Sequence, residues 1–159
     1  MSKKVIIIGS GIAGIASSLK LKSYGIDSII YDKGNFIGGR ISTKEIKNGT
    51  NRSFFFHGAQ FFTAKTNRFK KIIHTGIKEK YIKEFGNFNP PRYRGNRTMR
   101  EFLINLSKGL SINQNVKITE IKPHNDKIFV LNDKIKKSKS FDGVISTIPA
   151  PQAYELLNY

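Results

Sequence analysis

Three glycines near the start of the chain have the spacing of a phosphate-binding turn. Gly9, Gly11 and Gly14 fit the pattern G-x-G-x-x-G and follow the apolar run Val5–Ile8. In such a turn the first glycine permits the tight bend off a strand, the second lets a pyrophosphate approach the backbone, and the third lets a helix pack close to the strand. The free N–H groups of the helix N-terminus then hold the phosphates. The residues that we expect to bind a dinucleotide here are Gly9, Ser10, Gly11, Ile12, Ala13 and Gly14.

An acidic residue stands where a dinucleotide site of this kind needs one. Asp32 ends the second predicted strand, Ser28–Asp32, about 20 residues beyond the turn. Its carboxylate can accept hydrogen bonds from the ribose hydroxyls of adenosine, so Asp32 and the adjoining Lys33 join the predicted site. The acid favours a free 2′-hydroxyl over a 2′-phosphate and therefore disfavours NADP, but it does not distinguish NAD from FAD. The alternative interpretation is a glycine turn that serves packing alone.

The segments around these residues form a predicted β-α-β unit. Apolar residues recur at helical spacing from Ile12 to Tyr24, with Gly25 as the helix cap, and the two flanking runs have the character of buried parallel strands. A hairpin loop and the strand leaving it are expected over 133–140. The further elements that the pattern predicts are helices over 66–80 and 99–109 and strands over 115–121, 127–131 and 141–147.

Composition narrows the class of protein. The formal net charge is +17, yet the lysines are spread along the chain and form no basic stripe, so we attribute the charge to compositional bias and expect no nucleic-acid partner. The apolar runs have strand length, far below the ~20 residues of a membrane span, and the start has no signal-peptide pattern. The chain lacks cysteine, which suits the cytoplasm. We therefore expect a cytoplasmic protein without a membrane partner.

Beyond the turn, the sequence resembles the FAD-dependent amine oxidoreductases, and most of all their renalase-like branch. The stretches GSGIAG, YDKGNFIGGRIST and HGAQFFTA occur in the order found at the start of these proteins. The resemblance implies that Gly39 and Arg40, in the motif GGR, lie against the FAD diphosphate. It also implies that Gln60 donates to a flavin carbonyl and that the strand from Val116 pairs with the adenine through its backbone.

The same resemblance implies a fold class. We expect an α/β protein in which a Rossmann-like FAD/NAD(P)-binding domain, discontinuous over 1–50 and 110–159, encloses part of an inserted α+β substrate domain over 51–109. The sequence covers roughly the N-terminal half of the family pattern, so the fold is expected to be truncated.

Two hypotheses about function follow from this resemblance. The first is an FAD-dependent oxidoreductase that transfers hydride to the flavin from a small molecule, an amine or a reduced nicotinamide. The second is a dinucleotide-binding remnant, or one half of a split enzyme that a partner chain completes.

The sequence names no catalytic residue and no metal site. The histidines His57, His74 and His124 are far apart, and only His57 lies in a segment that the resemblance places near the flavin. The phenylalanines of the run FFFHGAQFF, at 54–62, favour core packing over a substrate pocket. In the segment PPRYRG, Arg92 and Arg94 could meet an anionic substrate, but a solvated loop is the favoured interpretation.

Overall fold

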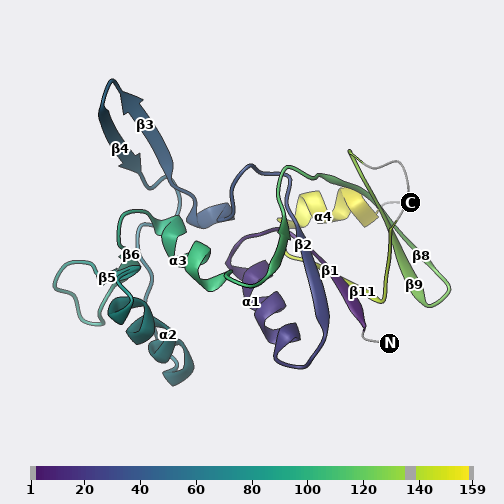
Figure 1. Cartoon of the computed structure of the whole chain (residues 1–159), viewed down its shortest axis with the longest axis horizontal. Coiled ribbons are helices and arrows are strands. Elements are labelled where there is room, and N and C mark those ends of the chain that lie inside the picture. Colours follow the sequence, from purple (N-terminus) through teal and green to yellow (C-terminus); the bar gives the residue numbers. More distant parts are fainter. Residues whose placement is uncertain (1–2, 135–138, 158–159) are drawn as a thin grey trace. The chain divides into compact units, whose positions relative to one another are not determined.

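The computed structural model describes residues 3–134 and 139–157. The chain divides into two units, which are seen in Figure 1. The first unit comprises Met1–Gly39 with Gly109–Tyr159, and the second unit comprises Arg40–Lys108. The chain therefore leaves the first unit at Gly39 and returns to it at Gly109. The domain ranges that the resemblance implies, 1–50 with 110–159 and 51–109, stay a prediction.

A parallel sheet forms the centre of the first unit. Its strand order is β11-β1-β2-β7, and every neighbouring pair is parallel. The helix α1 (Ile12–Lys22) connects β1 to β2 and lies beside them in Figure 1. Ile8 of β1 pairs with Tyr31 of β2, so the turn after β1 and the residue after β2 meet at one edge of the sheet. The four strands are β1 (Lys4–Ile8), β2 (Asp27–Tyr31), β7 (Ser111–Asn113) and β11 (Gly143–Ser146).

A second, antiparallel sheet shares a core with the first. It has the order β10-β9-β8, from β8 (Ile118–His124), β9 (Lys127–Asn132) and β10 (Lys139–Phe141). Successive side chains of a strand face opposite sides of its sheet, so Ile6 and Ile8 of β1 share one face. The buried cluster between the sheets consists of Ile6, Ile8, Tyr31, Ile118, Ile121, Val130 and Phe141. The last helix, α4 (Ala150–Leu157), packs against β8.

The predicted Rossmann-like α/β class is confirmed, with shifts at the ends of elements. Helix α1 ends at Lys22 rather than Tyr24, and Gly25 takes the left-handed conformation, φ +70°, two residues beyond the cap. Strand β2 ends at Tyr31, so Asp32 lies just outside it. The strand predicted from Asn115 begins only at Ile118, because Asn115 is itself left-handed at φ +57°. The predicted loop over 133–140 lies partly outside the described residues, at 135–138.

The second unit is built from two ribbons and two helices. The strands β3 (Lys44–Asn48) and β4 (Asn51–Phe55) form one antiparallel ribbon, and β5 (Ile82–Glu84) and β6 (Tyr93–Gly95) form the other. The predicted helices are present as α2 (Asn67–Lys78) and α3 (Met99–Leu106). Each has a threonine cap, Thr66 for α2 and Thr98 for α3. The short helix η1 (Gly39–Ile41) lies where the two units join in sequence.

The aromatic run does not pack as a single core. Phe62 stacks on the buried Phe102 of α3, with ring centroids 4.8 Å apart, as core packing predicts. Phe54 and Phe55, however, are 40% and 52% exposed on β4. The prediction of core packing is wrong for these two residues, because every position of the β3–β4 ribbon is exposed. Among the described residues no helix is long and apolar enough to cross a membrane.

Candidate dinucleotide site

Two glycines of the β1–α1 turn are required by the chain itself. Gly9 has φ +105°, and a Cβ there would lie 2.7 Å from the hydroxyl oxygen of Thr147. A Cβ on Gly14 would lie 1.9 Å from the carbonyl oxygen of Gly9, which is far inside van der Waals contact. The amide of Gly9 also donates to the carbonyl of Tyr31, at 2.8 Å. The turn is therefore held close to both β2 and the start of α1.

Gly11 differs, because nothing within the chain explains its lack of a side chain. A Cβ on Gly11 would meet no atom within 4 Å. Its φ and ψ, −73° and −178°, suit any residue, and it makes no side-chain cap for α1. The first amides of a helix have no partner within it, and they carry the positive end of the helix dipole. Ile12 and Ala13, also predicted to bind, are exposed at this end. The open space at Gly11 therefore suits an anionic group from outside the chain.

The carboxylate of Asp32 is fixed against this turn. Its Oδ2 accepts hydrogen bonds from both the amide and the hydroxyl of Ser10, each at 2.6 Å, and its Oδ1 accepts one from the amide of Gly34 at 2.7 Å. A carboxylate offers about four lone-pair sites, so Oδ1 keeps one for an incoming hydroxyl. Sequence reasoning gave Ser10 no such role. The signal that could have predicted this role is the hydroxyl residue between the first two glycines, together with the acid after the second strand.

The second glycine motif reaches the same turn. Gly39 has φ +51°, and a Cβ built on it would lie 3.5 Å from the Cα of Gly11. The neighbouring Gly38 is buried, and its amide donates to the carbonyl of Ser10 at 3.2 Å. The backbone of this motif therefore lies beside the first turn, where both could contact one dinucleotide.

Two further predicted residues lie close to Asp32. The amide of Val116 donates to the carbonyl of Asp32 at 2.9 Å, which places this segment beside the end of β2. That bond occupies the Val116 N–H, one of the backbone groups that the resemblance assigns to the adenine. Lys33 is exposed and donates from Nζ to Gln152 of α4 at 3.2 Å.

Arg40 and Gln60 belong to the second unit. The carbonyl of Arg40 accepts a hydrogen bond from the amide of Ala59 at 2.9 Å, and a Cβ on Gly58 would lie 2.0 Å from that carbonyl oxygen. Gln60 is exposed, two residues beyond Gly58. The segment HGAQ therefore passes directly over the backbone that follows the GGR glycines. Among the residues that the structure describes, no cluster of three potential metal ligands occurs.

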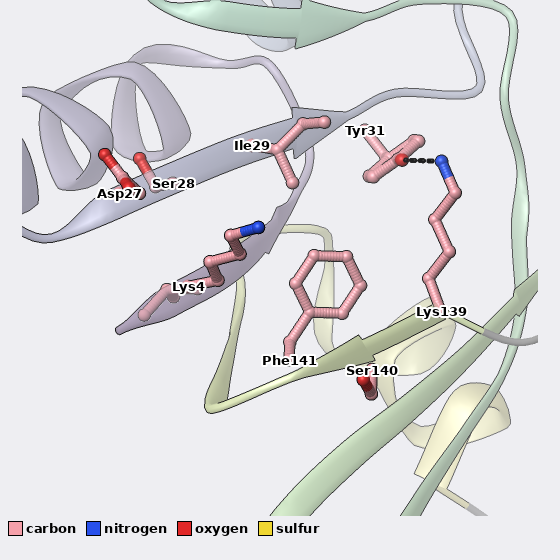
Figure 2. A pocket seen from close by; sticks show the side chains of 9 residues that line it. Lys4, Asp27, Ser28, Ile29, Tyr31, Lys139, Ser140 and Phe141 are labelled. Carbon is pink, nitrogen blue, oxygen red and sulfur yellow. Dashed lines mark hydrogen bonds between the residues drawn. The ribbon is translucent and has the colours of Figure 1, made fainter. Parts of the chain in front are cut away.

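The first unit also contains a cavity of about 450 Å³, which is distinct from the turn. Figure 2 shows it bounded by strands β1, β2 and β10, with Tyr31 and Lys139 joined by a hydrogen bond of 3.3 Å at its side. None of the predicted dinucleotide-binding residues lines it. Its walls are Lys4, Val5, Asp27, Ser28, Ile29, Tyr31, Lys139, Ser140 and Phe141.

Comparison with known proteins agrees with this geometry. Residues 7–74 match the family described as the NAD(P)-binding Rossmann-like domain. The 4,4'-diaponeurosporene oxygenase of Staphylococcus haemolyticus (strain JCSC1435) is 46% identical over 43 residues, which are 27% of this chain and 9% of that protein. Lysine-specific histone demethylase 1 of Caenorhabditis elegans is 45% identical over 47 residues, 30% of this chain and 6% of that protein. The matched segments therefore span less than a tenth of these relatives.

Solved structures extend the likeness of fold to nearly the whole chain. The fatty acid isomerase from P. acnes, described as CLA-producing, superimposes with a TM-score of 0.74 at 12% identity, covering 97% of this chain and 60% of that one. Tetracycline destructase Tet(51) superimposes with a TM-score of 0.64 at 15% identity, covering 100% of this chain and 42% of that one.

The fold and the turn together define a Rossmann-like dinucleotide-binding domain. The likeness in sequence to an oxygenase, a desaturase and a histone demethylase is confined to less than a third of this chain, and it agrees with the dinucleotide-binding turn. The renalase-like branch, and FAD as the particular dinucleotide, remain predictions.

Proposed function

We propose that the chain binds FAD as the dinucleotide-binding part of an oxidoreductase of the renalase-like type. The observation that carries this proposal is the fixed carboxylate of Asp32 beside the open space at Gly11. The Asp32 carboxylate is suited to ribose hydroxyls and the open space at Gly11 to a pyrophosphate. Both lie at the carboxyl edge of the parallel sheet. This edge is where ligands of open α/β folds bind.

FAD is favoured over NAD by the second glycine motif. The backbone at Gly39, with φ +51°, comes so near Gly11 that a Cβ on Gly39 would lie 3.5 Å from the Gly11 Cα. The bond from the Gly38 amide to the Ser10 carbonyl holds this segment beside the turn, where its backbone would flank a bound phosphate. Arg40 follows immediately and could add a planar fork of donors for phosphate oxygens. NAD-binding turns need only the first of these segments.

Bound FAD would supply the hydride acceptor, since the isoalloxazine carries that chemistry itself. The residues of this chain would then hold and orient the dinucleotide. Asp32 would accept from the ribose, the first amides of α1 would donate to the phosphates, and Ser10 would keep Asp32 in place. The proposed substrate is a small molecule that gives up hydride, an amine or a reduced nicotinamide.

The test is the visible absorption spectrum of the purified chain after incubation with FAD and desalting. We expect flavin bands that stay with the protein and that equal concentrations of NAD or NADP do not displace. Gly11→Ala should retain much less flavin than the parent, because its methyl group would enter the open space. Gly143→Ala is the matched control, since a Cβ there meets only Val5, at an ordinary 3.9 Å.

Three results would count against the proposal. Equal retention of FAD by Gly11→Ala would mean that the assigned site is wrong, and displacement by NAD would reassign the dinucleotide. A folded chain that takes up neither would favour the alternative of a dinucleotide-binding remnant or one half of a split enzyme.

A further inference from the structure

Two arginines of the second unit are held by phenylalanine rings. The guanidinium carbon of Arg92 lies 4.3 Å from the ring centroid of Phe61 and 3.9 Å from that of Phe88. The guanidinium carbon of Arg94 lies 4.8 Å from the ring centroid of Phe85. Phe61 and Phe85 are themselves stacked, with centroids 6.3 Å apart. We call these five residues the Arg–Phe face.

Strand pairing places both arginines on the same side of the β5–β6 ribbon. Arg94 lies in β6 and Arg92 stands one residue before that strand, so the two are two residues apart, the spacing that shares one face of a strand. Arg94 pairs with Lys83 across the ribbon, while the carbonyl of Arg92 accepts a hydrogen bond from the amide of Phe85 at 2.8 Å. Residues opposite each other across an antiparallel ribbon also share a face. Lys83 therefore lies on the same side of the ribbon and adds a third cation beside the two arginines.

The acid of this ribbon lies on the other side. Glu84 pairs with Tyr93, and Tyr93 packs toward Phe62 in the interior of the unit, with ring centroids 6.3 Å apart. Over residues 3–134 and 139–157, neither Arg92 nor Arg94 has a carboxylate within ion-pair distance. Within the part of the chain that the structure describes, these two arginines therefore form no ion pair.

Arg94 also has an unused donor. Its Nε is buried and has no hydrogen-bond partner within the described residues. Buried polar groups are nearly always paired, so the described residues leave part of the hydrogen-bonding capacity of Arg94 unused. The residue as a whole is only half-buried, so a ligand can reach its other nitrogens.

The packing decides which part of each guanidinium remains available. In a stacked contact the flat face of a guanidinium lies on the ring, and its N–H donors point outward in its plane. An arginine whose π face is covered can still offer a planar fork, and that fork matches a carboxylate in bidentate geometry. The rings around it are apolar, and Phe88 is 41% exposed beside Arg92.

We propose that the Arg–Phe face binds the carboxylate of a small apolar molecule, with the carboxylate on Arg92 and Arg94 and the apolar body against Phe88. The arginines are already ordered by the rings, so binding loses little side-chain freedom. All the residues that carry the proposal belong to the second unit, so it stands whether or not the chain binds FAD.

The experiment is a ligand-observed NMR titration of the full chain with phenylpropionate, an aromatic ring joined to a carboxylate. We expect saturable binding, and no binding of the uncharged phenylpropionamide at the same concentration. Arg92→Gln and Arg94→Gln should each weaken binding by about tenfold or more, because each removes charge-assisted hydrogen bonds. Arg92→Lys should bind several-fold more weakly than the parent, because it keeps the charge and loses the fork.

Arg52→Gln is the matched control, since it removes the same charge from the same unit. Arg52 lies on the exposed β3–β4 ribbon and is paired with Glu45 at 3.4 Å. Its loss should leave the affinity unchanged. A cooperative thermal unfolding transition establishes that each variant is folded. The comparison of phenylpropionate with phenylpropionamide needs only the parent chain, so it tests the role of the carboxylate even if a variant fails to fold.

Four outcomes would overturn the proposal. The parent could fail to bind phenylpropionate, or it could bind the amide equally well, which would indicate apolar contact only. Arg52→Gln could weaken binding as much as Arg92→Gln, which would indicate bulk charge. Inorganic phosphate could displace the probe at equal concentration, which would indicate a bare anion site without an apolar part.

Discussion

Alanine substitutions at Gly11 and Gly14, the second and third glycines of the β1–α1 turn, should separate an effect on binding from an effect on folding. At Gly14 the new Cβ would lie 1.9 Å from the carbonyl oxygen of Gly9. Close carbon–oxygen contacts are about 3.3 Å, so the start of α1 would have to move by more than about 1 Å. The obstacle is backbone, which cannot rotate aside as a side chain can. At Gly11 the same methyl group meets nothing within 4 Å.

The magnitudes follow from these contacts. Overpacking costs about 3 kcal/mol where the neighbour is rigid, and alanine regains about 1 kcal/mol over glycine within a helix. Gly14→Ala should therefore lower the free energy of unfolding by about 2 kcal/mol, and Tm by about 4–8 °C for a chain of this size. Gly11→Ala exchanges glycine for alanine at an N-cap, which costs less than about 1 kcal/mol and less than about 4 °C.

Thermal unfolding followed by circular dichroism, with and without FAD, is the assay. At 100 times its Kd a ligand stabilises the folded state by about 2.7 kcal/mol, so FAD should raise the Tm of the parent by about 5–11 °C. Gly11→Ala should lose at least about half of that rise, since tenfold weaker binding removes about 1.4 kcal/mol. A parental Tm for Gly14→Ala would refute the packing argument. A full FAD shift in Gly11→Ala would refute the assignment of the open space.

Three other changes test separate contacts. Asp32→Asn should lower the free energy of unfolding by about 1–3 kcal/mol, because an amide cannot accept all three hydrogen bonds that the carboxylate accepts. Chemical denaturation measures this loss, and an unchanged midpoint would contradict the role of these hydrogen bonds. Thr98→Ala removes the oxygen that accepts from the Glu101 amide at 3.2 Å and should cost about 1 kcal/mol, whereas Thr98→Ser should keep most of it. The hydrogen bond from Lys127 holds the pKa of Asp142 below its ordinary 3.8, so Asp142 stabilises the fold above that pH and loses its contribution as the pH falls through the lowered pKa. The Tm difference between the parent and Asp142→Asn should therefore be present at neutral pH and shrink below pH 3.8. A difference that is constant with pH would show that the ionised Asp142 does not stabilise the fold.

The sequence alone determined the parts of the fold that depend on local pattern. The β-α-β unit, the turn at Gly9–Gly14, and helices α2 and α3 follow from apolar periodicity and short-range capping, which act over a few residues. Strand β7 escaped prediction, because Ser111–Asn113 has only three residues and one apolar side chain. It is a strand because β2 offers a free edge to pair with.

The tertiary structure decided how distant residues meet at the candidate site. The bonds from Ser10 to Asp32 and the approach of Gly39 to Gly11 join segments more than twenty residues apart, and no local pattern encodes such contacts. The same holds for the arginines expected in a solvated loop. Pairing of β5 with β6 set Arg92 and Arg94 on one face, and stacking on phenylalanine rings fixed them there. Residue types and spacing thus specified which chemistry was available, and packing between distant segments decided where it was brought together.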